Sequence, residues 1–516
     1  MSLPKLPISI QHFEVLRQEN YLYIDKTKFV YELMDDGGAF FLSRPRRFGK
    51  SLFVSTLAAV ANGERALFEN TWIEDKWDWQ RKYPILHFQF ASIGFKDIGL
   101  EAAIVRQLKI FCKMYAIETD TNSVQHLFVA LLTGLSAQKG KIVLLIDEYD
   151  KPIISYMEEH KQTQALENQE IMRNFYGVLK DFGNCLHLTF ITGVSKFSRV
   201  SLFSEVNHLE DLTLDTRFAT ALGYTQREVE DSFEAHIQAF LDKNTTFTRQ
   251  KLLEKVKIWY NGYSWDGTTT VYNPFALLNF FKKRQFTNHW FATGTPLFLT
   301  HVLLDKGQTD FENTVVSADF LEQYSLENMQ SAALLFQTGY LTIKDLNEED
   351  NTLVLDFPNF EVQQSFYQYL MSYLGQKERD SRITMRNLGQ CLEENDLSKA
   401  YYIMQDMFNV LPYEVYKASN EALYHGLVHI LFHYLGLNIE SEVHTKYGRL
   451  DAVVQTTNHV YIMEFKYNKT AAVAMQQIKQ KDYASKYRES GKIIVGIGIN
   501  FVKKSRSLDE WVVEIL

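Results

Sequence analysis

Gly49-Lys50-Ser51 is a triplet that can hold the phosphates of a nucleotide when it joins a strand to a helix. In that setting the backbone N–H groups of the loop and the positive end of the helix create an anion site. The Lys50 ammonium can then reach the β- and γ-phosphates, and the Ser51 hydroxyl can ligate Mg²⁺. The full pattern requires glycine at residue 44, where this chain has Arg44, and Pro45 removes a backbone donor. An ordinary cationic turn is the alternative for this loop taken alone.

The segment Lys141–Asp150, KIVLLIDEYD, supplies the acids that a nucleotide site needs. Its apolar residues 142–146 are typical of a central parallel strand that is buried on both faces. Asp147 and Glu148 follow at the carboxyl end of that strand, the edge at which open α/β sheets bind ligands. Asp147 can hold Mg²⁺, and Glu148 can polarise the attacking water. A solvated acidic turn is the alternative, but the two segments together predict a nucleoside triphosphate site.

The elements that must position these residues alternate between strand and helix. We expect strands at residues 39–43, 84–90, 142–146 and 187–194, and helices at residues 51–61 and 100–114. Such alternation indicates a parallel sheet. Thr192 and Ser195 lie at the polar end of the last strand, where either side chain can meet the γ-phosphate or the water; a plain strand end is equally consistent. The predicted nucleotide-binding residues are Arg46, Arg47, Phe48, Gly49, Lys50, Ser51, Leu52, Asp147 and Ser195.

Asp451, Glu464 and Lys466 form a second group that can act on phosphate. We expect strands at residues 449–455 and 459–467, joined by a short turn and therefore antiparallel. Side chains alternate along a strand, so Glu464 and Lys466 share one face, and Asp451 can face the same spot from the neighbouring strand. Two carboxylates and a lysine in this arrangement can chelate Mg²⁺ and orient a water for phosphodiester cleavage. An exposed Glu–Lys ion pair is the alternative.

A helix that precedes these strands carries a polar stripe. Glu421, His425, His429 and His433 recur every four residues and therefore follow one side of the helix. We assign Glu421 to the metal site. The histidines are either zinc ligands or a polar shoulder beside an apolar face.

A helix expected at residues 471–488 places Gln477 and Tyr483 near the backbone of the scissile strand. Ten Lys or Arg residues and three Asp or Glu residues lie between residues 464 and 506, against a net charge of −9 for the whole chain. Such a local basic patch, which includes Lys479, is what a nucleic-acid backbone requires.

The composition limits the class of protein. A chain of 516 residues should hold roughly three domains, and a hydrophobic content of 46% is ample for several cores. No apolar run approaches the length of a membrane span, and the N-terminus has no export leader. Three widely spaced cysteines, Cys112, Cys185 and Cys391, suit a reducing compartment. We therefore expect a cytoplasmic protein without a membrane segment.

The middle of the chain is predicted to be mostly helical. Around residues 321–376 a helix, the strand GYLTI, the acidic turn NEEDN, the strand LVLDF and a second helix follow one another. This order is typical of a winged helix, which either reads DNA or packs as a lid on the ATPase. Residues 376–415 are expected to form a polar helical connector.

Several segments in fixed order, RPRRFGKS, LLIDEYDKPI, ITGVSKFSRVSLFSEVN, WYNGYSW, LFQTGYLTI, EALYH, YGRLDAVV, EFK and QQIKQKDYA, give the chain a family resemblance. It resembles bacterial AAA-ATPase-like proteins fused to a PD-(D/E)XK nuclease-superfamily domain. The resemblance implies an ASCE-type P-loop core and a restriction-endonuclease-like domain. It also implies ATP and Mg²⁺ as ligands, and DNA as a partner. Leu450 stands where the nuclease motif has proline.

The resemblance also implies roles for single residues. Lys50 and Ser51 correspond to the nucleotide loop, and Asp147 and Glu148 to the magnesium-binding and water-activating acids. In the nuclease half, the implied metal ligands and catalytic residues are Asp451, Glu464 and Lys466, with Glu421 ahead of them and Gln477 and Tyr483 behind.

The expected fold class is α/β, in four parts. Residues 1–210 form a parallel-sheet P-loop domain and 211–375 a helical and winged-helix-like region. Residues 376–415 form a connector, and 416–516 a nuclease-like α/β domain.

The expected function is ATP binding and hydrolysis that controls a Mg²⁺-dependent DNA endonuclease. A role with mobile DNA or phage defence is suggested by analogy alone. The alternative is a nucleotide-dependent switch whose nuclease-like domain binds DNA or a partner without cutting it. The sequence leaves open whether Arg46, Arg47 or Arg199 neutralises γ-phosphate charge within the chain or from a neighbouring subunit of a homo-oligomer.

Overall fold

The computed structural model describes residues 3–157, 162–195, 209–290, 311–322, 331–347, 349–373, 381–409, 428, 438–445, 448–502 and 507–516. The chain divides into two compact units. One comprises Met1–Gly294 and Glu312–Val362, and the other comprises Thr295–Phe311 and Gln363–Leu516. No helix in the described ranges has both the length and the apolar character needed to cross a membrane.

The first unit is built on a parallel sheet of five strands in the order β2-β3-β4-β1-β5. The strands are β1 (Gly38–Ser43), β2 (Ile85–Gln89), β3 (Ile142–Asp147), β4 (Leu186–Gly193) and β5 (Leu209–Asp211). Every residue of β3 is buried, as expected of a central strand with both faces covered. The ladders place Ser43 beside Gly193 and Ile146 beside Ile191. The carboxyl ends of β1, β3 and β4 therefore meet at one edge.

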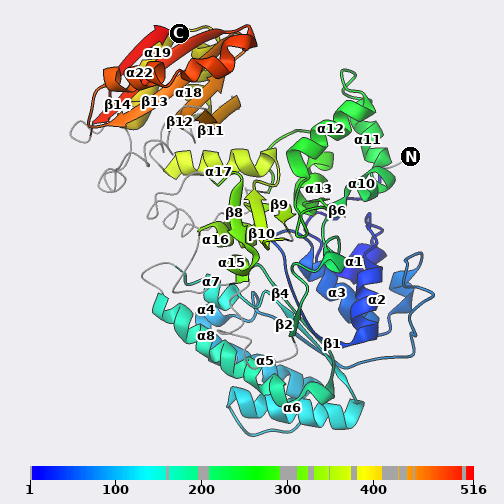
Figure 1. Cartoon of the computed structure of the whole chain (residues 1–516). Helices are drawn as coiled ribbons and strands as arrows, with labels where there is room; N and C mark the ends of the chain where they lie inside the picture. The colour runs from blue at the N-terminus through cyan, green and yellow to red at the C-terminus, as the bar shows by residue number, and fades with distance from the viewer. Residues whose placement is uncertain are drawn as a thin grey trace. The chain divides into compact units, whose positions relative to one another are not determined.

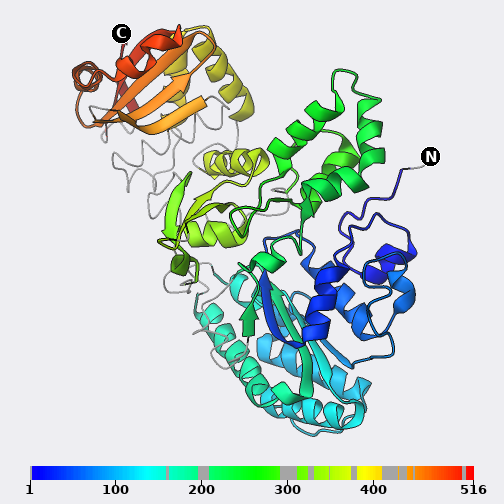
Figure 2. The same ribbon diagram turned by 45° about the vertical axis from the view of Figure 1, so that its right-hand side comes forward.

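Helices cover this sheet on both sides. Figure 1 and Figure 2 show α1, α2 and α3 gathered on one side and α5, α6 and α8 on the other. Their bounds are α1 (Phe13–Gln18), α2 (Thr27–Asp36), α3 (Lys50–Ala61), α5 (Leu100–Met114), α6 (Val124–Lys139) and α8 (Gln162–Gly177). The predicted alternation of strand and helix is confirmed. The helix after the Gly-Lys-Ser loop begins one residue earlier than predicted, at Lys50.

A helical region follows the sheet. It contains α10 (Gln226–Ser232), α11 (Glu234–Leu241), α12 (Arg249–Tyr260) and α13 (Pro274–Lys283), and a short pair of strands, β6 (Tyr224–Thr225) and β7 (Val271–Tyr272). The predicted start of α13 is confirmed, because the Asn273 side chain accepts a hydrogen bond from the Ala276 N–H and Pro274 occupies the first turn.

The winged-helix-like part has three strands rather than the two that were predicted. The strands β8 (Thr314–Ser317), β9 (Thr342–Asn347) and β10 (Thr352–Asp356) pair in the order β8-β10-β9. The accompanying helices are α15 (Ala318–Glu322), α16 (Ser331–Thr338) and α17 (Phe360–Tyr373). Of the helix predicted near residues 321–335, the structure describes the two ends, where residues 321–322 lie in α15 and residues 331–335 lie in α16.

The second unit contains a mixed sheet in the order β11-β12-β13-β14-β15, in which only β13 and β14 are parallel. The strands are β11 (Asn438–Thr445), β12 (Gly448–Gln455), β13 (His459–Tyr467), β14 (Ile493–Val502) and β15 (Ser507–Ile515). The helices α18 (Ser381–Glu393), α19 (Leu397–Asn409) and α22 (Ala471–Gln480) belong to the same unit. The predicted α/β class is confirmed, and β12 and β13 are antiparallel as predicted.

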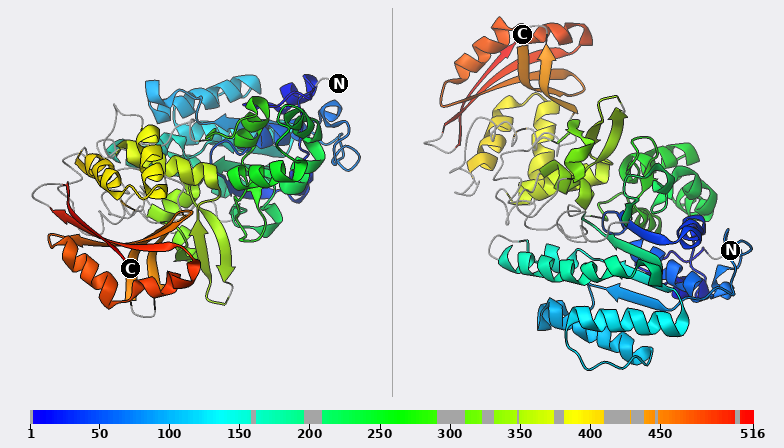
Figure 3. Two further views of the ribbon diagram at one scale, coloured as in Figure 1. Left: turned by 90° about the horizontal axis from the view of Figure 1, so that it is seen from above. Right: turned by 60° about the horizontal axis from the view of Figure 1, so that its bottom comes forward.

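Helix α22 lies directly on this sheet, as Figure 3 shows. A Cβ atom added at Gly498 of β14 would lie 2.4 Å from the Ala471 carbonyl oxygen, so the close approach requires glycine there. The helix predicted at residues 471–488 ends early, at Gln480. Asp482 then adopts a left-handed backbone with φ 40°, and a 3-10 helix, η7 (Tyr483–Ser490), follows.

Candidate nucleotide and nuclease sites

The loop between β1 and α3 has the backbone of an anion site. Arg47 (φ 68°) and Gly49 (φ 91°) are both left-handed, and Gly49 is the residue that precedes the first turn of α3. Alternation of left- and right-handed residues directs successive backbone N–H groups toward one point, and a helix N-terminus adds its partial positive charge. The strand, loop and helix predicted around Lys50 therefore have the geometry that phosphate binding needs.

Lys50 is buried, and its ammonium group donates to the loop's own carbonyl oxygens. The Nζ atom lies 2.8 Å from the Arg44 oxygen and 2.8 Å from the Pro45 oxygen. Burial lowers the pKa of Lys50 to about 8, although the nearby carboxylates of Asp147 and Asp150 raise it in part. Lys50 is therefore a cation held at the base of the loop.

Asp147 ends β3 and is 1% exposed. Burial raises its pKa, while the Ser51 hydroxyl and the Lys50 ammonium offset part of that effect. Neither carboxylate oxygen has a well-aligned hydrogen-bond donor among the described residues. Buried carboxylate oxygens without donors are costly unless a cation neutralises them. The pairing of Asp147 with the Ser51 hydroxyl therefore fits Mg²⁺, which prefers oxygen ligands.

Glu148 sits in a turn that the next two residues hold in place. Its backbone is left-handed (φ 51°), which costs free energy for a residue other than glycine. The buried Asp150 carboxylate accepts hydrogen bonds from the backbone N–H groups of Ser195 (2.7 Å) and Val194 (3.0 Å). The Tyr149 hydroxyl donates to the Ser195 carbonyl at 2.7 Å. This turn therefore ties Glu148 to the end of β4.

Sequence reasoning missed Tyr149 and Asp150. The available signal was a third acid in the same turn, two residues after Glu148. Thr192, for which the sequence left open either a contact with phosphate or water or a plain strand end, donates its hydroxyl to the Leu42 carbonyl at 2.6 Å and links β4 to β1. Ser195, one of the predicted nucleotide-binding residues, is buried, with 1% of its surface exposed.

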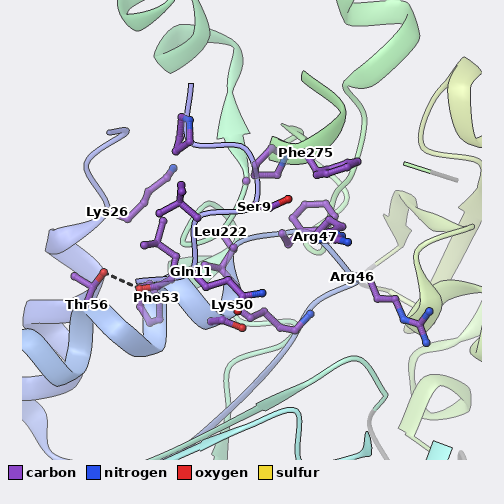
Figure 4. Close-up of a pocket in the computed structure, with 18 of the residues that line it drawn as sticks. Ser9, Gln11, Lys26, Arg46, Arg47, Lys50, Phe53, Thr56, Leu222 and Phe275 are labelled. Carbon is purple, nitrogen blue, oxygen red and sulfur yellow. Dashed lines mark hydrogen bonds between the residues drawn. The ribbon is translucent and has the colours of Figure 1, made fainter. Parts of the chain in front are cut away.

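A cavity of about 400 Å³ opens beside the loop. Among the predicted residues, its walls include Arg46, Arg47, Phe48, Gly49, Lys50, Ser51, Leu52 and Glu148, whereas Asp147 and Ser195 are not part of them. Figure 4 shows Ser9, Gln11, Leu222 and Phe275 around the same space, from segments far apart in the sequence. A cavity wall that combines the phosphate loop with apolar side chains such as Leu222 and Phe275 suits a nucleotide.

Arg44, at the position of the missing glycine, points away from the cavity. Its guanidinium donates to the carbonyl oxygens of Ser43 (2.8 Å), Thr213 (2.9 Å) and Phe218 (3.1 Å). It also lies 3.9 Å from the centre of the Trp265 ring, and burial lowers its pKa to about 9. Arginine is tolerated here because its side chain anchors a neighbouring segment instead of entering the phosphate site.

In the second unit, Asp451, Glu464 and Lys466 come together as predicted from the strand period. The Lys466 Nζ atom lies 2.7 Å from Glu464 Oε1, and Asp451 Oδ2 accepts a hydrogen bond from the Phe465 N–H at 2.8 Å. Glu464 is 1% exposed, and its Oε2 atom has no hydrogen-bond donor among the described residues. Burial, followed by the neighbouring Asp451 carboxylate, raises the pKa of Glu464 to about 7. This carboxylate pair also fits Mg²⁺.

Comparison with known protein families supports both the predicted ATPase-like domain and the predicted nuclease-like domain. A family model described as "Predicted AAA-ATPase" matches residues 7–203, and a model described as "PD-(D/E)XK nuclease superfamily" matches residues 419–511. The chain is also 36% identical, over the full length of both proteins, to an Azotobacter chroococcum mcd 1 protein described as "Uncharacterized protein in vnfD 5'region".

The chain belongs to the AAA-ATPase-like proteins with a PD-(D/E)XK nuclease-superfamily domain. Lys50, Asp147 and Glu148 fall within the AAA-ATPase-like match, and Asp451 and Glu464 fall within the PD-(D/E)XK match. The two oxygen-rich sites thus lie in the two different domains of this family.

The PD-(D/E)XK domain departs from its motif at Leu450, which pairs with Val443 in the ladder between β11 and β12. A proline there would remove a backbone N–H from the strand.

The remaining PD-(D/E)XK candidates differ in exposure. Tyr483 is 1% exposed and lies in the core cluster, where burial raises its pKa and Gln477 is its hydrogen-bond partner. Lys479 is exposed and forms an ion pair with Glu514. The predictions for Glu421, the three histidines near it and Arg199 lie outside the described residues.

Proposed function

We propose that this chain binds and hydrolyses ATP with Mg²⁺ in its first domain, and that the nucleotide state controls a Mg²⁺-dependent DNA endonuclease in its last domain. We assign it to the cytoplasm, with which the three free cysteines agree. A role in defence against mobile DNA, or in its maintenance, is the cellular setting we propose by analogy.

One observation carries this proposal: in each domain a buried carboxylate with an oxygen that lacks a well-aligned donor lies near a buried lysine. In the first domain the acid is Asp147 and the lysine is Lys50, and in the second they are Glu464 and Lys466. In each arrangement the buried charges are costly when no ligand is bound, which favours binding of a cation together with an anionic ligand. Phosphate chemistry assisted by Mg²⁺ supplies both.

In the ATPase, Lys50 would exchange the Arg44 and Pro45 carbonyl oxygens for phosphate oxygens. Asp147 and Ser51 would hold the magnesium ion, which neutralises phosphate charge when it is bound. Glu148, whose turn is fixed to the end of β4, would accept a proton from the attacking water.

In the nuclease, Asp451 and Glu464 would hold the magnesium ion, which activates water and stabilises the charge that develops on the phosphate. Lys466, anchored by Glu464 at 2.7 Å, would orient the attacking water. Basic residues along α22 and η7, Lys479 among them, would contact the DNA backbone.

Plasmid nicking tests the nuclease half. The native chain should nick plasmid DNA with Mg²⁺ and not with EDTA, and ATP should change the rate. Asp451→Ala should abolish cleavage, while Glu394→Gln, an exposed change in the same unit but outside α22 and η7, should leave it unchanged. Cleavage that survives Asp451→Ala would remove the active-site assignment. If native chain binds DNA in an ATP-dependent way without cutting it, the non-cleaving switch replaces our proposal.

Phosphate release from ATP tests the ATPase half. Lys50→Ala should abolish ATP binding. Glu148→Gln should retain binding and lower turnover by at least a hundredfold, as expected for the loss of a general base. Unchanged ATP affinity in Lys50→Ala would show that the nucleotide lies elsewhere.

A further inference from the structure

The outward-facing carbonyl of the phosphate loop is held by two side chains that are distant in sequence. The Arg46 oxygen accepts a hydrogen bond from Trp290 Nε1 at 3.2 Å and a longer one from Asn273 Nδ2 at 3.4 Å. Both donors lie beyond residue 203, where the match to the AAA-ATPase-like family ends. The loop is therefore contacted by a part of the chain that contributes no phosphate-binding motif.

Other contacts cover the same outer side of the loop. A Cβ atom added at Gly339 would lie 2.5 Å from Pro45 Cβ, and Gly339 has φ +89°, so only glycine suits this approach. The Phe48 ring packs edge-to-face on Tyr263, with the ring centres 4.8 Å apart. Because Pro45, Arg46 and Phe48 are each contacted by residues beyond residue 203, the loop backbone has little freedom to rotate.

Because the peptide bond is planar, a contact that holds the Arg46 carbonyl also fixes the direction of the Arg47 N–H. The described backbone has no cis peptide bonds, so the N–H of Arg47 points opposite to the carbonyl of Arg46. The carbonyl faces Trp290, and Arg47 lines the nucleotide cavity. The carbonyls of Arg44 and Pro45, in contrast, both face the Lys50 ammonium. Holding the Arg46 oxygen outward therefore aims the next N–H toward the cavity.

Both donors are themselves fixed. The Trp290 backbone N–H donates to Glu361 Oε1 at 2.6 Å, and its indole packs edge-to-face on Tyr340 at 5.2 Å. Asn273 caps α13 through its Oδ1 atom, which leaves its Nδ2 group for the loop. Donors that are already ordered lose little entropy when they hold the loop.

We infer that Trp290 and Asn273 are positioning residues for the phosphate chain of the nucleotide: they hold the Arg46 carbonyl outward, so the Arg47 N–H faces the bound phosphates. This inference rests on the proposed nucleotide site. It assigns a role in phosphate recognition to residues outside the P-loop, and it predicts that they affect ligands with phosphate and not the nucleoside.

Binding of ATP and of adenosine to matched variants tests the inference. Trp290→Phe keeps an aromatic ring against Tyr340 and removes the indole donor. Asn273→Asp keeps the helix cap and replaces the amide donor with an oxygen that repels the carbonyl. Each variant should weaken ATP binding about fivefold, the effect expected for one neutral hydrogen bond, and should leave adenosine binding unchanged. The double variant should lose less than the product of the two, because both side chains act on one oxygen.

Trp79→Phe is the matched control, because the Trp79 indole also donates to a backbone oxygen, that of Glu74, at 2.8 Å. It should retain native ATP affinity. Urea unfolding midpoints of Trp290→Phe and Trp79→Phe should agree, so that a folding defect is distinguished from a binding defect.

ATP affinity equal to native in both Trp290→Phe and Asn273→Asp would overturn the inference, and so would an equal loss of ATP and adenosine binding. Failure of the native chain to bind ATP would instead overturn the proposed function.

Discussion

Glu361 is an acid whose burial should make the first unit less stable as the pH rises. The residue lies in the first turn of α17, is 1% exposed, and accepts hydrogen bonds from the backbone N–H groups of His289 and Trp290. Burial raises its pKa from 4.5 to about 8, although those two donors oppose the shift. Replacement by glutamine retains the acceptor oxygen and removes the ionisation.

The sign and size follow from linkage. Between pH 4.5 and pH 8 the unfolded chain has lost the Glu361 proton and the folded chain still holds it, so the free energy of unfolding falls as the pH rises. At about 1.4 kcal/mol per pH unit, the fall over this range is on the order of 5 kcal/mol. The amide of Glu361→Gln needs a new partner, which costs about 1–3 kcal/mol at every pH.

Urea unfolding of the native chain and Glu361→Gln at pH 5, 6, 7 and 8, followed by tryptophan fluorescence, measures the difference. The difference in unfolding free energy should shift steadily in favour of the variant from pH 5 to pH 8. Glu254→Gln, which changes an exposed glutamate of the same unit, should run parallel to the native chain. If Glu361→Gln also runs parallel, Glu361 is not protonated in the folded state at neutral pH and the reasoning is refuted.

Three further outcomes follow from the nucleotide site. Because the Lys50 pKa is about 8, calorimetry should find ATP binding about tenfold weaker at pH 9 than at pH 7; a flat profile would mean that Lys50 stays charged or does not meet phosphate. Arg44→Met removes the guanidinium donors of the buried Ser43 and Thr213 carbonyls, whereas the Phe218 carbonyl keeps the Ala221 N–H, and should lower the unfolding free energy by about 3 kcal/mol in urea titrations; unchanged stability would contradict the anchoring role. A Cβ atom at Gly193 would lie 2.6 Å from the Tyr149 ring, so Gly193→Ala should slow phosphate release more than it weakens ATP binding, and the opposite ranking would separate the β4 end from catalysis.

The sequence patterns predicted the long elements and both groups of acids, because those depend on local periodicity. The helix α5 has the predicted bounds, and so does the strand β13. The face shared by Glu464 and Lys466 followed from the period of the strand alone. Local signals of this kind are strong when an element is long and regularly patterned.

What could not be predicted depends on contacts between distant segments. The strand β8 has only four residues and is exposed at alternate positions, which gives little signal without its partner β10. The break after α22 rests on a left-handed Asp482, a conformation that aspartate adopts only sometimes. The direction of the Arg44 side chain depends on its packing against the Trp265 ring, which is far away in the sequence.

The two carbonyl partners of Lys50 mean that the loop resists occupation by weak ligands. Any incoming anion must displace these two hydrogen bonds of Lys50. Its binding free energy is therefore only the difference between its own attraction to Lys50 and the bonds it replaces. A singly charged anion offers few oxygens to replace those two bonds, whereas a chain of linked phosphates offers several oxygens at once. Selection for a polyphosphate would thus begin in the resting state of the protein, before any part of the base is recognised.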